Sequence, residues 1–140
     1  MNPDVSNLHI DKKTPETELV DIMGGSARWE IKVHDHGLVA LCDGGAADVV
    51  LTVGGTGVRP TDVVPDVTRE VAEKEIPGIG EAMRQESLKK VQTAMLSRGT
   101  AAVRAGTLIV NLPGSPRGAR ENLGVVLPVL EHTVGKIQGR

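Results

Sequence analysis

The sequence predicts an α/β fold in which a doubly wound sheet of parallel strands carries helices on both faces. Two apolar runs, Ala46–Val53 and Thr107–Leu112, are rich in β-branched residues and show little polar alternation. Such runs are typical of strands that are covered on both sides. A helical pattern follows each run, which favours alternating strands and helices. The 140 residues match the size of one domain, so we expect a single domain over residues 1–140.

Two patterns precede the first of these strands. Thr14 and Pro15 are suited to the cap and first position of a short helix over residues 14–23. The segment 27–41 alternates enough to predict a strand. After the strand, Asp66 or Thr68 is expected to cap a helix over residues 67–75.

Two longer helices are expected in the second half of the chain. Pro77 and Gly78 should end the preceding helix. The apolar spacing of Met83, Leu88, Val91 and Met95 then predicts a helix over residues 80–96. Ser115 and Pro116 have the residue types preferred at the cap and first position of the last helix. Its apolar face should comprise Leu123, Val126, Leu127, Leu130, Val134 and Ile137.

Composition restricts the classes of partner. With one Trp and no Phe or Tyr, the core must be aliphatic, and the aromatic faces on which nucleic-acid bases stack are nearly absent. The net charge is −2 and no basic run is present, so we expect no nucleic-acid partner. No membrane-length apolar run or signal peptide is visible, which favours a cytoplasmic location. Cys42 is the only cysteine and is expected to be a buried or partly buried small residue.

The loop after the first strand combines flexible backbone with polar side chains. Gly54, Gly55, Thr56 and Gly57 would let backbone N–H groups approach an anion, and Asp62 follows closely. A carboxylate beside phosphate needs a cation, which suggests a nucleotide-type ligand with Mg²⁺. The pattern is neither a P-loop nor a dinucleotide fingerprint. A tight turn without a ligand is the alternative.

A second candidate anion site follows the strand Thr107–Leu112. We expect this strand to be an adjacent or near-adjacent parallel neighbour of Ala46–Val53, so that the two loops lie at the same edge of the sheet. Gly114 and Ser115 stand at a helix N-terminus, where unpaired N–H groups and the helix dipole favour anions. Arg117 and Arg120 lie in the first turns, where a bound anion would offset their unfavourable position. Alternatively, both arginines point into solvent.

Four segments resemble the molybdopterin adenylyltransferase family, which includes the Mog- and MoaB-like proteins of molybdenum cofactor biosynthesis. They read LTVGGTGVRPTDVVPDVT, EIPGIGEAMRQESL, TAMLSRGTAAVRAGTLIVNLPGSPRGARENL and VLPVLEH, in register from about Ala46 to Gly139. The resemblance implies a Rossmann-like three-layer sandwich with a mostly parallel sheet, assembled as a homotrimer. It also implies transfer of AMP from Mg²⁺-bound ATP to molybdopterin, with the molybdenum-insertion enzyme as a further partner.

The resemblance also assigns site residues. Asp62 matches the essential carboxylate, which would be catalytic and would orient Mg²⁺ rather than abstract a proton. The matching binding loops supply Gly54, Gly55, Thr56, Gly57, Asn111, Pro113, Gly114 and Ser115. Arg59 either balances phosphate charge or faces solvent, and Glu81 is either a wall of the site or a trimer contact. Asp66 is expected to cap a helix instead of binding a ligand.

The first third of the chain departs from the family pattern. It lacks the Thr-x-Ser-Asp-type motif and the Pro-Asp-Glu turn, for which Asp35 or Asp43 could stand in. His34 and His36 flank Asp35, although two histidines without a distant third ligand are a weak metal signal. Two alternatives to the enzyme therefore stay open. One is a non-catalytic trimeric protein that binds pterin or nucleotide, and the other is a related domain of a molybdenum-insertion or competence-damage protein.

Overall fold

The computed structural model describes residues 8–11, 38–45 and 47–140. Their strands form one sheet of five, in the order β1-β2-β5-β4-β3. The strands are β1 Leu8–Asp11, β2 Val49–Val53, β3 Lys74–Glu75, β4 Ala101–Arg104 and β5 Thr107–Leu112. The expected parallel pairing of the two apolar runs is confirmed, because β2 and β5 are parallel neighbours.

The sheet is mixed, but four of its five strands, β1, β2, β3 and β5, run in one direction and only β4 runs against them, in keeping with the expected mostly parallel sheet. β1 pairs with β2 in parallel, but β4 is antiparallel to both β5 and β3. A two-residue turn at Ala105 and Gly106 joins β4 to β5, with φ angles of 49° and 80°. Hairpins of this kind require positive φ at both central residues. The dipeptide Ala-Gly is a weak signal for such a turn, so the hairpin was missed.

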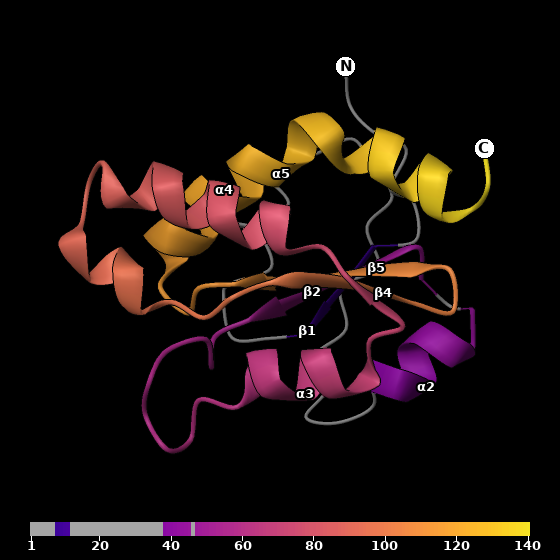
Figure 1. The fold of residues 1–140 in the computed structure, drawn as a ribbon, viewed down its shortest axis with the longest axis horizontal. Coiled ribbons are helices and arrows are strands. Elements are labelled where there is room, and N and C mark those ends of the chain that lie inside the picture. Colours follow the sequence, from indigo (N-terminus) through magenta and orange to yellow (C-terminus); the bar gives the residue numbers. More distant parts are fainter. Residues whose placement is uncertain (1–7, 12–37, 46) are drawn as a thin grey trace.

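Helices cover both faces of the sheet (Figure 1). α4 and α5 lie over one face, and α2 and α3 lie over the other. The helices are α2 Leu38–Asp43, α3 Val64–Val71, α4 Pro77–Leu88 and α5 Pro116–Ile137, with a 3₁₀ helix, η1, at Gln92–Leu96. In the described part of the chain, no helix is long and apolar enough to cross a membrane.

The core lies between the sheet and α5 and is aliphatic, as the composition requires. Every residue of β5 and nearly every residue of β2 is buried, which confirms that both strands are covered on two sides. α5 presents the expected apolar face to this core. Its buried apolar residues are Ala119, Leu123, Val126, Leu130 and Val134, with Leu127 and Ile137 partly buried against them.

Two expected elements differ from those observed. The part of segment 27–41 that the structure describes is helical, because α2 begins at Leu38. α3 begins at Val64 without a side-chain cap, so neither Asp66 nor Thr68 caps it. Residues 74–75 form β3 instead of extending that helix. The expected helix over residues 14–23 lies outside the described residues.

Proline placement explains a further difference. Pro77 begins α4 instead of ending the helix before it, in the first-turn position where proline is tolerated. α4 ends at Leu88, and the residues expected to continue it form η1. Met83 is buried, but Val91 and Met95 are 52% and 65% exposed. Their helical spacing therefore did not mark a buried face.

Candidate functional site

The loops after β2 and β5 meet at one edge of the sheet, as the sequence predicts. Because the two strands are parallel neighbours, their carboxyl ends lie side by side. The N–H of Gly54 donates to the carbonyl of Leu112 over 2.9 Å. A Cβ placed on Gly114 would lie only 3.2 Å from the Cα of Gly54. The absence of side chains at both positions therefore allows direct backbone contact between the loops.

The other two glycines of the first loop also permit close packing. Gly55 has φ +68°, and a Cβ there would lie 2.6 Å from Cγ2 of Val64, at the start of α3. A Cβ on Gly57 would lie 2.9 Å from a carboxylate oxygen of Asp62. These glycines thus shape the loop whether or not a ligand is bound.

Asp62 is a buried carboxylate held by a neighbouring arginine. It is 5% exposed, and its Oδ2 accepts from the backbone N–H of Arg59 at 3.0 Å and from Nε at 3.1 Å. Oδ1 accepts from Nη2 of Arg59 at 3.1 Å. The hydrogen bond from the Arg59 side chain is the main cause that lowers the pKa of Asp62 below its usual value. Arg59 is therefore the ion-pair partner of Asp62.

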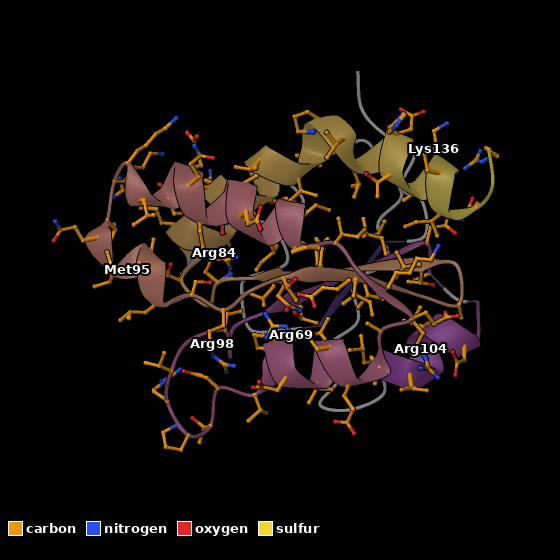
Figure 2. All side chains as sticks on the ribbon, viewed as in Figure 1. Arg69, Arg84, Met95, Arg98, Arg104 and Lys136 are labelled. Atoms are coloured by element: carbon orange, nitrogen blue, oxygen red, sulfur yellow. The ribbon has the colours of Figure 1, made fainter. Side chains whose placement is uncertain are left out.

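This arrangement does not fit a resident Mg²⁺ site at Asp62. Both carboxylate oxygens already accept hydrogen bonds from Arg59. Within the described residues, no three His, Cys, Asp or Glu side chains are grouped so that they could hold a metal ion. His34, Asp35 and His36 lie outside the described residues. Asp43 pairs with Arg104 at 3.0 Å, and Figure 2 shows Arg104 at the opposite end of the sheet from the loops. Asp43 therefore does not replace the missing acid.

Asn111 is a buried amide of β5 that bonds to three neighbouring parts of the fold. It is 1% exposed, and its side-chain N–H groups donate to the hydroxyls of Thr52 and Thr68, each at 3.0 Å. Its Oδ1 accepts from the backbone N–H of Thr100 at 3.2 Å. The amide of Asn111 thus joins β5 to β2, α3 and the start of β4.

Arg98 fastens the glycine-containing loop to the rest of the fold. Its backbone N–H donates to the carbonyl of Thr56 at 2.7 Å, and its Nε donates to that of Gly57 at 2.8 Å. Nη2 donates to the carbonyl of Asp62 at 2.5 Å. Figure 2 shows Arg98 beside the loop that leads into α3. Asp66, which was expected to cap a helix, instead pairs with Arg98.

A pocket of about 310 Å³ opens beside the two loops, between α4, η1 and the start of α5. Its walls come from segments far apart in the sequence. The lining residues are Thr56, Gly57, Arg84, Ser87, Val91, Thr93, Ala94, Leu96, Ser97, Pro113, Ser115, Arg117, Gly118, Glu121 and Asn122.

Charged side chains line one side of this pocket. Glu121 accepts from Lys90 and from Arg117, each at 3.2 Å. Hydrogen bonding to Lys90 is the largest cause that lowers the pKa of Glu121. Arg84 donates to the carbonyl of Gly99 at 2.6 Å. The pocket is thus bordered by more basic than acidic groups, which suits an anionic ligand.

Four of the site residues expected from the sequence line the pocket, and five do not. Thr56, Gly57, Pro113 and Ser115 line it. Ser115 also caps α5, as expected, by accepting from the N–H of Gly118 at 3.0 Å. The residues that do not line it are Gly54, Gly55, Asp62, Asn111 and Gly114.

Two functional candidates, Arg84 and Arg98, were missed. Their partners lie between 13 and 41 residues away in the sequence, so no local pattern could reveal the contacts. Glu81 is exposed and does not line the pocket. Cys42 is buried, as expected, and burial raises the pKa of its thiol to about 11.

Comparison with known proteins gives consistent matches. A family model described as the probable molybdopterin binding domain matches residues 35–132. The molybdopterin adenylyltransferase of Helicobacter pylori strain J99 is 46% identical over 102 residues, which cover 73% of this chain and 58% of that protein. The molybdopterin adenylyltransferase of Escherichia coli strain K12 is 50% identical over 86 residues, covering 61% of this chain and 44% of that protein.

A solved structure extends the match over nearly the whole chain. The molybdopterin biosynthesis enzyme MoaB from Thermus thermophilus has a TM-score of 0.78 and 38% identity, and the match covers 95% of this chain and 94% of that chain. By contrast, the chain spans 58% or less of the two curated relatives above.

Proposed function

Because the chain belongs to the family described as the probable molybdopterin binding domain, we propose that it is a molybdopterin adenylyltransferase. The relatives from Helicobacter pylori and Escherichia coli bear that name. The observation that carries the proposal is the junction of two loops at Gly54 and Gly114, beside a pocket that Thr56 and Ser115 line. Such a junction can hold two phosphate-bearing substrates side by side.

The proposed reaction needs alignment more than it needs a base. An oxygen of the molybdopterin phosphate attacks the α-phosphorus of ATP, the bond from that phosphorus to the bridging oxygen breaks, and pyrophosphate leaves. The attacking oxygen is already anionic, so the main barriers are charge repulsion and orientation. The hydroxyls of Thr56 and Ser115 and the basic side of the pocket would orient and neutralise the phosphates.

Asp62 stays in the proposal as the catalytic carboxylate, with ATP entering as its Mg²⁺ complex. Because Arg59 holds both oxygens of Asp62, we derive no step through an ion at this carboxylate. We expect Asp62→Asn to fold normally and to lose about 10²-fold in AMP transfer, the effect of removing one electrostatic group from a preorganised site. A variant that transfers AMP at the wild-type rate, or loses activity only by unfolding, would mark Asp62 as structural.

The proposal also includes a detailed fold type, an oligomeric state, a cellular location and a partner that the family resemblance implies. They are a Rossmann-like three-layer sandwich as a single domain, a homotrimer, a cytoplasmic location where ATP is available, and delivery of the product to a molybdenum-insertion enzyme. Exposed apolar side chains on α4 and η1, including Leu88, Met95 and Leu96, support self-association. Sedimentation equilibrium should give a trimer at micromolar concentration, whereas a monomer would remove this part of the proposal.

Pyrophosphate release tests the proposed activity. The protein is incubated with Mg²⁺-ATP with and without molybdopterin, and pyrophosphate is measured over time. Release that requires molybdopterin supports adenylyl transfer, whereas release without it indicates simple ATP hydrolysis and contradicts the proposal.

A non-catalytic pterin- or nucleotide-binding protein is the second candidate. The ion pair between Arg59 and Asp62 favours it, because the expected catalytic carboxylate is occupied. Binding of molybdopterin without any pyrophosphate release would establish this candidate in place of the enzyme.

A further inference from the structure

Arg84 is a partly buried arginine on α4 that lines the pocket. Its Nη1 donates to the carbonyl of Gly99 at 2.6 Å and, more weakly, to that of Ser97 at 3.4 Å. Figure 2 shows the side chain reaching from α4 toward the chain that leads into β4. In the part of the chain that the structure describes, its Nε and Nη2 make no hydrogen bond and its charge has no carboxylate partner.

The other cations at the pocket are compensated. Arg117 pairs with Glu121, and Lys90 shares the same carboxylate. The Arg117 side chain is also 82% exposed, so solvent screens its charge. Of the three, only Arg84 combines partial burial with a charge that no described carboxylate balances.

The position of Arg84 is fixed by close packing. A Cβ on Gly80 would lie 2.5 Å from the carbonyl oxygen of Gly99 and 3.3 Å from Nη2 of Arg84. α4 therefore approaches the segment before β4 closely, with the guanidinium held at the contact. A planar fork held in place can give two parallel hydrogen bonds to a phosphate at little entropic cost.

We propose that Arg84 binds a phosphate group of a substrate in this pocket, through the N–H groups that Gly99 and Ser97 leave free. The inference rests on the proposed function, because both substrates of that reaction carry phosphate. The phosphate belongs either to ATP or to molybdopterin, and the two sources are separated by experiment.

Arg84→Gln is the central variant, because Gln removes the charge and the fork but can still donate to the carbonyl of Gly99. Isothermal titration calorimetry measures the binding of Mg²⁺-ATP and, separately, of molybdopterin. Lys136→Gln is the matched control, since it removes a positive charge at the far end of α5 (Figure 2). Thermal melts verify that each variant is folded.

We expect Arg84→Gln to bind at least one of the two ligands with an affinity about tenfold or more below that of wild type, the usual effect of losing a charged hydrogen bond. Lys136→Gln should bind both ligands within about twofold of wild type, and Arg117→Gln should have a smaller effect than Arg84→Gln. A loss confined to ATP identifies a nucleotide phosphate, and a loss confined to molybdopterin identifies the pterin phosphate. Unchanged binding of both ligands, or a larger effect of Arg117→Gln, would overturn the proposal.

Two further measurements keep the result unambiguous. If Arg84→Gln does not fold, Arg84→Lys keeps the charge without the fork. Binding at least about threefold weaker then supports the proposal, and unchanged binding overturns it. AMP transfer by the wild type is measured separately. Weaker ligand binding by Arg84→Gln in a protein without transferase activity would contradict the proposed function but leave the role of Arg84 intact.

Discussion

Arg98 and Asp66 form a two-point ion pair, with Nη1–Oδ1 at 2.9 Å and Nη2–Oδ2 at 3.0 Å. The same guanidinium donates to the carbonyls of Gly57 and Asp62. The first turn of α3 and the glycine-containing loop are therefore held by one side chain. Because that loop forms part of the pocket wall, Arg98 positions the candidate site without lining it.

The ion pair predicts a pH-dependent stability. The hydrogen bond from Arg98 is the main cause that lowers the pKa of Asp66 in the folded state. The stabilisation is therefore fully present above the unfolded-state pKa of about 3.9 and is lost as pH falls through the folded-state value. Asp66→Asn should lower Tm near neutral pH, and its difference from wild type should shrink in acid.

Thermal melts across this pH range check the effect, with the exposed Glu131→Gln on α5 as control. A Tm difference between Asp66→Asn and wild type that is constant down to about pH 2.5, well below the unfolded-state pKa, would contradict the assigned role.

The hydroxyl of Thr68 should be important for stability. It donates to the carbonyl of Val64 at 2.9 Å and accepts from Asn111 at 3.0 Å. Thr68→Val removes the acceptor and leaves a buried N–H of Asn111 unpaired, at a cost of about 1–3 kcal/mol. Thr133→Val is the control, because Thr133 makes the same type of bond, to Val129, near the surface. Denaturant unfolding should show that Thr68→Val lowers the free energy of unfolding more than Thr133→Val does. Equal effects of the two variants would contradict this assignment.

Gly55 should tolerate no side chain. Gly55→Ala places a methyl group against Val64 and forces Ala to φ +68°. We therefore expect the free energy of unfolding to fall by about 2 kcal/mol or more. Gly45→Ala separates the two causes, since Gly45 has φ +66° but open space around its Cβ. It should cost about 1–2 kcal/mol from backbone strain alone. If denaturant unfolding shows that Gly45→Ala lowers the free energy of unfolding as much as Gly55→Ala does, or more, the result would argue against the close contact at Val64.

The thiol of Cys42 should be unreactive in the native protein. Burial is the main cause that raises its pKa to about 11, so thiolate is scarce at neutral pH. A thiol reagent should therefore label the protein only after it is unfolded in guanidinium, when one thiol per chain becomes available. Rapid labelling under native conditions would show that the site around Cys42 opens.

The parts of the fold predicted from sequence are those that depend on local pattern. β2 and β5 were identified because strands buried on both faces give continuous apolar runs. The start of α5 was identified because Ser115 and Pro116 suit a helix N-terminus. The two loops were expected to meet because parallel neighbours end at the same edge.

The missed features depend on contacts that are distant in sequence or on weak turn signals. Ala105 and Gly106 do not resemble the usual hairpin dipeptides, so the antiparallel β4–β5 pair was not foreseen. Asp62 was expected to face a ligand, but the sequence did not indicate that Arg59 would occupy both of its oxygens. Arg98 reaches carbonyls 36 and 41 residues away, which no periodicity reports.

The most direct test of the proposed function is to follow the α-phosphate of ATP. Wild-type protein is incubated with molybdopterin and ATP labelled at that phosphate. The pterin product is then isolated, and its mass is measured by mass spectrometry. Adenylyl transfer predicts labelled molybdopterin heavier by one AMP unit, with one pyrophosphate released per product. Label that stays in ATP, or appears only as free AMP while molybdopterin is unchanged in mass, would contradict the assignment.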